Sequence, residues 1–220
     1  MDARANWLVQ MRAERALAEL LPALSARGVE AMVVKGVALA HSLYEDQAAR
    51  PISDVDVRIR PSKLHHVRTL AGERGWKVVM DAPVYDNMVL EIQDHQVDIE
   101  GHVGPPYVSA LGIGEFFERA TPQVFASGFT ALVPSVEDHA ILLTLNIFKD
   151  KITSAASWAI EDVRRIVSAP GFDENVFLAR VSEAGIRTIT RIVASHMASL
   201  GSQSWASILR ALGPETRPVY

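Results

Sequence analysis

The sequence contains no cysteine, which excludes disulfide bonds, thiolate metal ligands and a cysteine nucleophile. It also lacks any apolar run that approaches the roughly 20 residues a membrane-spanning helix requires. The first residues do not show the basic-then-apolar order of a secretory signal. Together these absences predict a cytoplasmic protein with no membrane partner.

An excess of basic residues is lacking as well. The 220 residues include 22 Lys and Arg against 26 Asp and Glu, which gives a formal net charge of −4. Sequence-independent binding to nucleic acid depends on neutralising many phosphates, so this balance disfavours it. Hydrophobic residues make up 49% of the chain, enough to predict a globular protein with its own core.

The periodicity of the apolar residues divides the chain near Pro134. In the first part, a helical segment at 7–24 and others after it alternate with short runs that predict strands at 31–34, 54–59, 76–80, 88–92, 96–100 and 129–133. In the second part every segment is helical, with helices expected at about 136–150, 154–168, 174–184, 187–200 and 203–212. We therefore predict an α+β protein. Residues 1–133 form a mixed, mostly antiparallel sheet with flanking helices, and residues 134–220 form a helical domain.

Two acidic residues interrupt one of the apolar strands, in the run Asp54-Val55-Asp56-Val57. Side chains alternate faces along a strand, so Asp54 and Asp56 share one face, expected to be exposed, while the valines face the core. Their backbones are about 6.5–7 Å apart, which suits two metal ions about 3.5–4 Å apart. Magnesium fits such a site because it prefers oxygen ligands.

A third acid, Asp98, has the same phase in the strand at 96–100, and Glu100 follows it on the same face. If the two strands are neighbours, Asp98 meets Asp54 and Asp56. Such a cluster is costly without a cation, because like charges repel. The alternative is a solvated polar face with no chemical role.

The pair Lys35-Gly36 stands where a strand passes into a helix. The first N–H groups of a helix and its dipole favour an anion, so a triphosphate could bind at this turn. Gly36 lets the backbone approach closely, and Lys35, Arg50 or Ser53 could supply charge or hydrogen bonds to phosphate oxygens. An ordinary turn is the alternative, and the Walker A pattern is absent.

These residues, taken in order and spacing, resemble the signature of an uncharacterised family within the polymerase-beta-like nucleotidyltransferase superfamily. The resemblance covers about residues 30–200. It is carried by Val34 to Ala40, Leu43-Tyr44, Arg50, Ser53 to Val57, Val97 to Ile99 and Val133 to His139.

The resemblance implies a metal-dependent enzyme in which an acceptor hydroxyl attacks the α-phosphorus of a nucleoside triphosphate and pyrophosphate leaves. It implies Mg²⁺, or Mn²⁺ in its place, as cofactor and favours ATP as donor. Asp98 is the expected proton acceptor. The catalytic and metal-binding residues would be Asp54, Asp56 and Asp98, and the nucleotide-binding residues Lys35, Gly36, Arg50, Ser53 and Lys149.

Two departures from the superfamily pattern keep alternatives open. Lys35-Gly36 stands where members usually have Gly-Ser or Gly-Gly, and Ile99-Glu100 replaces the leucine and histidine that often follow the third acid, with His102 the nearest histidine. Glu100 either joins the acids or is solvated, the latter being favoured. The alternatives are an inactive nucleotide- or metal-binding regulator on the same fold and a helical interaction protein. The acceptor stays open between a small molecule, a peptide or protein side chain and an RNA end.

Overall fold

The computed structural model describes residues 3–105, 108–150, 152 and 155–214. The chain divides into two compact units, which we call the first unit (Met1–Val103 with Gly112–Ser135) and the second unit (Gly104–Leu111 with Val136–Tyr220). The short segment 104–111 belongs to the second unit, where the Ala110 backbone N–H donates to the Ala184 carbonyl at 3.0 Å.

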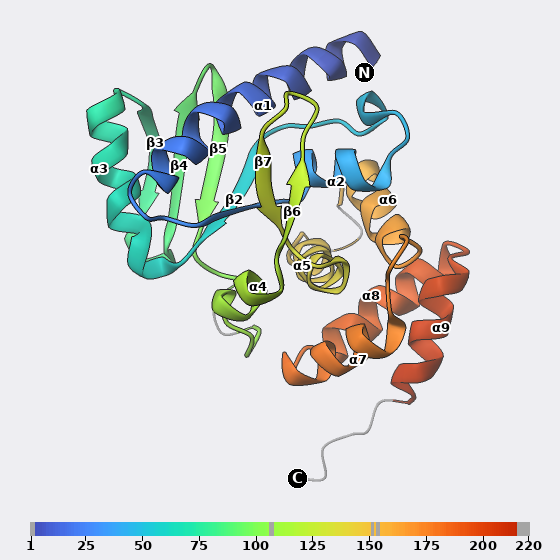
Figure 1. The fold of residues 1–220 in the computed structure, drawn as a ribbon. Coiled ribbons are helices and arrows are strands. Elements are labelled where there is room, and N and C mark those ends of the chain that lie inside the picture. Colours follow the sequence, from blue (N-terminus) through green and yellow to red (C-terminus); the bar gives the residue numbers. More distant parts are fainter. Residues whose placement is uncertain (1–2, 106–107, 151, 153–154, 215–220) are drawn as a thin grey trace. The chain divides into compact units, whose positions relative to one another are not determined.

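The first unit is built on a sheet that has seven strands within the described residues, in the order β3-β4-β5-β2-β1-β7-β6 (Figure 1). The β2–β5 and β1–β7 pairs are parallel and the other neighbours antiparallel, so the predicted mixed, mostly antiparallel sheet is confirmed. The strands are β1 (Ala31–Val34), β2 (Val55–Ile59), β3 (Lys77–Ala82), β4 (Asn87–Ile92), β5 (His95–Glu100), β6 (Thr121–Val124) and β7 (Thr130–Val133).

The helices of the first unit are α1 (Ala3–Ser25), α2 (Gly36–Leu43), α3 (Leu64–Arg74) and α4 (Ile113–Arg119), with short 3₁₀ turns at Gln47–Ala49, Pro61–Lys63 and Pro83–Tyr85. Three of them, α1, α2 and α3, contribute apolar side chains to one core with the strands of this sheet. Leu17 and Leu20 of α1 share one core with Val55 and Val57 of β2. Burying each such side chain contributes about 1.5–3 kcal/mol, and this burial fixes which face of β2 the acids must take.

From Val136 onward the described residues of the second unit are mainly helical, as predicted, whereas those of its segment 104–111 form no helix. The helices of this unit are α5 (Val136–Lys149), α6 (Ser157–Ile166), α7 (Glu174–Glu183), α8 (Arg187–Ser199) and α9 (Gln203–Leu212). The start predicted for the second of these helices, residue 154, lies outside the described residues. Trp205 is at the centre of the core: its Nε1 donates to the Val163 carbonyl at 2.7 Å and its ring meets Phe177 edge to face.

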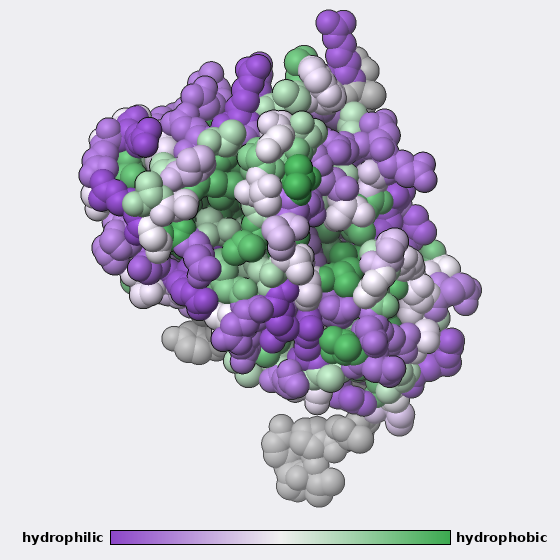
Figure 2. Space-filling model, in the orientation of Figure 1, coloured by the Kyte–Doolittle hydropathy of each residue, from purple (hydrophilic) through white to green (hydrophobic). Residues whose placement is uncertain are grey.

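No helix in the described part of the chain is long and apolar enough to cross a membrane. On the face drawn in Figure 2, hydrophilic side chains surround small groups of apolar ones.

Candidate active site

Two neighbouring strands of the sheet bring acids from distant parts of the sequence together. β2 and β5 run parallel, and their register places Asp56 beside Asp98 and Arg58 beside Glu100. Because the valines of both strands face the core, the alternation of side chains directs these four residues to the other face of the sheet. The predicted meeting of Asp56 and Asp98 therefore follows from the strand pairing.

The face that carries Asp56 is not the exposed surface expected from the sequence. Asp56 is only 6% exposed and Arg58 only 2%. The expectation was wrong because β2 is an interior strand, flanked by β1 and β5, and because cationic side chains pack around the acid.

Asp56 is stabilised in its ionised form by those cations. Its Oδ1 accepts a hydrogen bond from Lys35 Nζ at 2.6 Å. Burial alone would raise the pKa of Asp56, but the positive charges of Lys35, Arg58 and Arg50 outweigh burial and hold its pKa below the ordinary value. Asp56 is thus a carboxylate across the physiological pH range.

Asp98 shows the opposite behaviour, although it lies next to Asp56. Burial, followed by the negative charges of Glu100 and Asp56, raises the pKa of Asp98 to about 6. Its Oδ1 accepts one hydrogen bond, from Asn87 Nδ2 at 2.5 Å, which opposes the shift without cancelling it. Two adjacent acids with divergent pKa values are typical of sites that move protons.

Arg58 and Glu100 form the next layer along the two strands. Arg58 Nη2 pairs with Glu100 Oε2, so the favoured expectation of a solvated Glu100 was wrong: its carboxylate is bound to a buried cation. Arg58 Nε and Nη1 are buried and have no hydrogen-bond partner among the described residues. Arg58 was not among the predicted site residues, although the sequence contains a signal for it: a charge in phase with Asp54 and Asp56. His102 pairs with Asp86, Nε2 to Oδ2 at 3.0 Å.

Asp54 lies just before β2 begins and is half-buried. Its Oδ1 accepts from the hydroxyl of Ser53 at 2.6 Å. Within the described residues, no group of three or more His, Asp or Glu side chains is gathered as metal ligands. The structure therefore pairs Asp56 with Asp98 but does not assemble Asp54 with them into a finished three-acid centre. We call Asp56, Asp98 and Glu100 the acid cluster.

The glycine turn lies beside the start of β2. A Cβ placed on Gly36 would be 3.4 Å from Arg50 Nη1 and 3.5 Å from the Asp54 carbonyl oxygen, so the turn, Arg50 and Asp54 are close neighbours. Arg50 is buried and donates from Nη1 to the Pro51 carbonyl. Lys35 occupies the N-cap position of α2. Its backbone φ is 52°, in the left-handed region that favours glycine.

The predicted phosphate-binding residues thus fall into two groups. Lys35, Gly36, Arg50 and Ser53 lie around the turn in the first unit. Lys149 is exposed at the end of α5 in the second unit.

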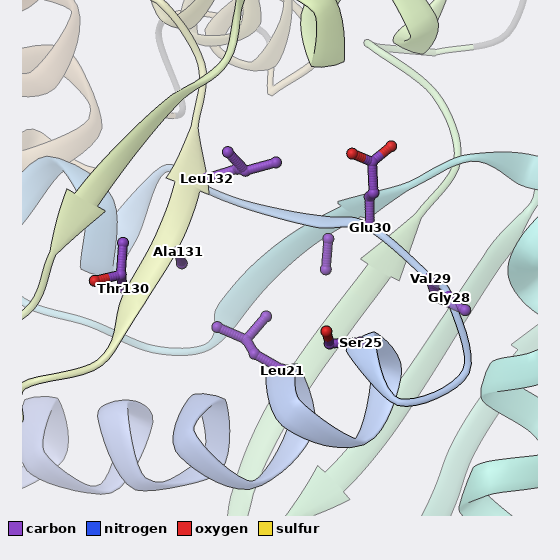
Figure 3. A pocket seen from close by; sticks show the side chains of 9 residues that line it. Leu21, Ser25, Gly28, Val29, Glu30, Thr130, Ala131 and Leu132 are labelled. Carbon is purple, nitrogen blue, oxygen red and sulfur yellow. The ribbon is translucent and has the colours of Figure 1, made fainter.

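A separate hollow of about 300 Å³ lies among α1, the start of β1 and β7 (Figure 3). Its walls are mostly apolar and its one acidic side chain is Glu30. None of the acid cluster lines it, so it offers no set of chemical groups comparable to that of β2 and β5.

The model of a family described as uncharacterised nucleotidyltransferase matches residues 2–201. Among curated protein sequences there is no match.

Solved structures with a similar fold include two of ANT(2'')-Ia. The solution structure of this antibiotic-resistance factor is 14% identical, covers 85% of this chain and 94% of its own, and has a TM-score of 0.54. The crystal structure in complex with adenylyl-2''-tobramycin is 17% identical, covers 76% and 94%, and also has a TM-score of 0.54. An antigenic nucleotidyltransferase-like protein from Paracoccidioides brasiliensis is 14% identical, covers 94% and 92%, and has a TM-score of 0.47.

Proposed function

Because this chain belongs to the uncharacterised nucleotidyltransferase family, we propose that it transfers a nucleoside monophosphate from a nucleoside triphosphate to a hydroxyl group. The membership confirms the resemblance found in the sequence. The observation that carries the proposal is the pair Asp56 and Asp98, side by side on parallel strands with pKa values displaced in opposite directions.

The acids fit a hard divalent cation. They offer only oxygen ligands, which Mg²⁺ prefers. Burial and the negative charges of Glu100 and Asp56 raise the pKa of Asp98, so a cation at this point would stabilise its ionised form. We propose that Asp56 and Asp98 hold Mg²⁺, or Mn²⁺ in its place, and that Asp54, just before β2, joins them as a ligand when the ion binds. When bound, the metal supplies positive charge that lowers the pKa of the acceptor hydroxyl and neutralises phosphate oxygens.

Asp98 is the proposed general base. In the transfer, the acceptor oxygen forms a bond to the α-phosphorus, the bond from that phosphorus to the oxygen bridging to the β-phosphorus breaks, and pyrophosphate leaves. Asp98 takes the hydroxyl proton. In the metal-free protein the pKa of Asp98 is raised and that of Asp56 is lowered, so Asp98 is the one of the two acids that accepts a proton more readily.

The triphosphate is proposed to bind at the glycine turn. The N–H groups at the start of α2 favour an anion, and Lys35, Gly36, Arg50 and Ser53 surround that point. Lys149 of the second unit is the further nucleotide-binding residue that the resemblance implies. We favour ATP as donor, since a protein of similar fold is seen with an adenylylated product.

The division of labour follows the predicted boundary. Residues 1–133 would hold the metal and supply every proposed nucleotide-binding residue except Lys149. Residues 134–220 would supply Lys149 and select the acceptor, which is a small molecule, a peptide or protein side chain, or an RNA end. The absence of cysteine supports a cytoplasmic location.

An inactive nucleotide-binding regulator is the second candidate. The observation that favours it is the ion pair of Lys35 with Asp56, because a lysine replaces the usual small residue of the turn.

The test is a transfer assay with α-labelled triphosphates, Mg²⁺ and acceptors from the three classes. We expect label on one acceptor class with stoichiometric pyrophosphate, and no label with Asp56→Asn that is folded by circular dichroism. A wild-type protein that binds Mg²⁺ and ATP but moves no label in any combination would favour the regulator.

A further inference from the structure

Lys35 occupies an oxygen that the proposed function assigns to a metal ion. Its Nζ is 2.6 Å from Asp56 Oδ1, and the two side chains are only 15% and 8% exposed. Opposite charges attract more strongly in such a partly dry place than in bulk water. Lys35 is therefore the cation in direct contact with Asp56 Oδ1 in this structure, with the charges of Arg58 and Arg50 nearby.

A metal ion and the Lys35 ammonium compete for this position. Magnesium binds carboxylate oxygens at about 2.0–2.1 Å, so an ion on Asp56 Oδ1 would be in contact with an ammonium that hydrogen-bonds the same atom. Two positive charges at that separation repel. The ammonium has to leave Asp56 Oδ1 before a metal ion binds there.

The backbone of Lys35 indicates where the ammonium goes. Val34 pairs with Asp56 across β1 and β2, so Lys35 begins the turn directly beside the acid. It also stands immediately before Gly36, the first residue of α2, where N–H groups favour phosphate. The lysine stem is flexible, so bond rotations can carry the ammonium from Asp56 to a phosphate at the turn.

Lys35 holds this place at a conformational cost. Its φ of 52° lies where a residue with a side chain is strained and glycine is not. A glycine would suit the backbone better but would provide no ammonium. The positive charge at this position is thus the feature that distinguishes Lys35 from the residue its conformation favours.

We propose that Lys35 exchanges partners, neutralising Asp56 in the nucleotide-free protein and moving to the triphosphate when nucleotide and metal bind. This inference rests on the proposed function. It makes Lys35 a positioning residue that links the two binding events. The metal binds weakly alone because it must displace Lys35, and the triphosphate makes room for the metal by taking Lys35 away.

The test is a Mn²⁺ titration of the full chain, followed by the electron paramagnetic resonance of unbound Mn²⁺, with no nucleotide present. Lys35→Met should bind Mn²⁺ about 10-fold more tightly than the wild type. A separate titration should show that the same variant binds a non-hydrolysable ATP analogue about 10-fold more weakly. General damage to the site would weaken both, so the opposite directions identify the exchange.

Two further variants sharpen the test. Lys77→Met removes an exposed lysine of β3, whose side chain is 68% exposed, and should leave both affinities unchanged. Lys35→Gly also removes the ammonium and suits the positive φ, so it provides the same readout if Lys35→Met folds poorly.

Mn²⁺ affinity that is equal to or below that of the wild type in both Lys35 variants, including no binding at all, overturns the exchange. If that happens while the wild type still transfers label, only the inference about Lys35 fails. If the exchange is seen but no label moves in the transfer assay, the exchange stands and the proposed transfer fails.

Discussion

The buried Glu14 and the acid cluster, in which Asp56 is buried and Asp98 and Glu100 are half-buried, differ in how many hydrogen-bond donors surround each acid. Glu14 of α1 is 1% exposed, and its Oε2 accepts from the Ser127 backbone N–H at 2.9 Å and from the Ser127 hydroxyl at 2.5 Å. Its Oε1 is 2.8 Å from His41 Nε2. Burial raises the pKa of Glu14, but these hydrogen bonds and the His41 charge outweigh burial and lower it.

Compared with Glu14, the acid cluster contains more carboxylates, and Asp98 has fewer hydrogen-bond donors around it. Asp98 accepts one side-chain hydrogen bond from Asn87, and it faces Asp56 and Glu100, which themselves bind Lys35 and Arg58. Its pKa therefore rises to about 6 while that of Glu14 falls.

This difference shows that burial alone does not decide whether an acid stays charged. A buried carboxylate with donors on both oxygens is a structural element that ties helices and loops together. A half-buried carboxylate with few donors and with other acids beside it is poised to bind a proton or a cation. Glu14 and Asp98 are examples of the two cases within one unit.

The largest expected effect is on the rate of transfer, which should depend on Asp98 and not on Glu14. Asp98→Asn should lower the rate of transfer by about 10²–10⁴-fold, because it removes the proton acceptor, and should leave triphosphate binding largely intact. Glu14→Gln should leave the rate per folded molecule within about 3-fold of the wild type, because Glu14 lies outside the site and takes no part in proton transfer. Initial rates of label transfer check both, and unchanged turnover in Asp98→Asn would remove Asp98 from the mechanism.

The next largest effect is on stability, and here Glu14→Gln should have a larger effect than Asp98→Asn. Glu14→Gln should lower the free energy of unfolding by about 1.5–3 kcal/mol, because the amide keeps one acceptor oxygen and the donors of either Ser127 or His41 lose their hydrogen bond to the charged carboxylate. Asp98→Asn should be neutral or slightly stabilising without metal, because it removes a repelled charge. Urea denaturation in EDTA at pH 7.5 measures both. A larger loss in Asp98→Asn than in Glu14→Gln would contradict the comparison.

The smallest effect is a difference in pH dependence. The folded pKa of Asp98, about 6, exceeds its ordinary value of 3.8, so its favourable contribution to stability is complete below 3.8 and is lost as pH rises through 6. Glu14 has a lowered pKa, so its contribution is present above 4.5 and lost only at lower pH.

Between pH 7.5 and 5, metal-free wild type should therefore gain about 1–2 kcal/mol relative to Asp98→Asn. Glu14→Gln should follow the wild-type slope. Urea denaturation at several pH values in EDTA measures the difference, and parallel curves for wild type and Asp98→Asn would show that Asp98 is not the group responsible.

The sequence predicted most elements because their periodicity is strong. The alternation in β2 and the helical repeats after residue 135 needed no tertiary information. β6 escaped prediction because Thr121-Pro122-Gln123-Val124 has no apolar alternation and includes a proline. β6 is an edge strand of the sheet, and proline is tolerated there because its missing N–H can face solvent and not a neighbouring strand.

The sequence by itself determined which residues are acidic, their common phase on β2 and β5, and the resemblance that the family match bears out. Only the tertiary structure decided that Asp56 is buried against Lys35 and that Arg58 binds Glu100. Phase is a local property of one strand, readable from side-chain alternation. Burial and ion pairing depend on which strands are neighbours and in what register, and that is set by the packing of the whole sheet.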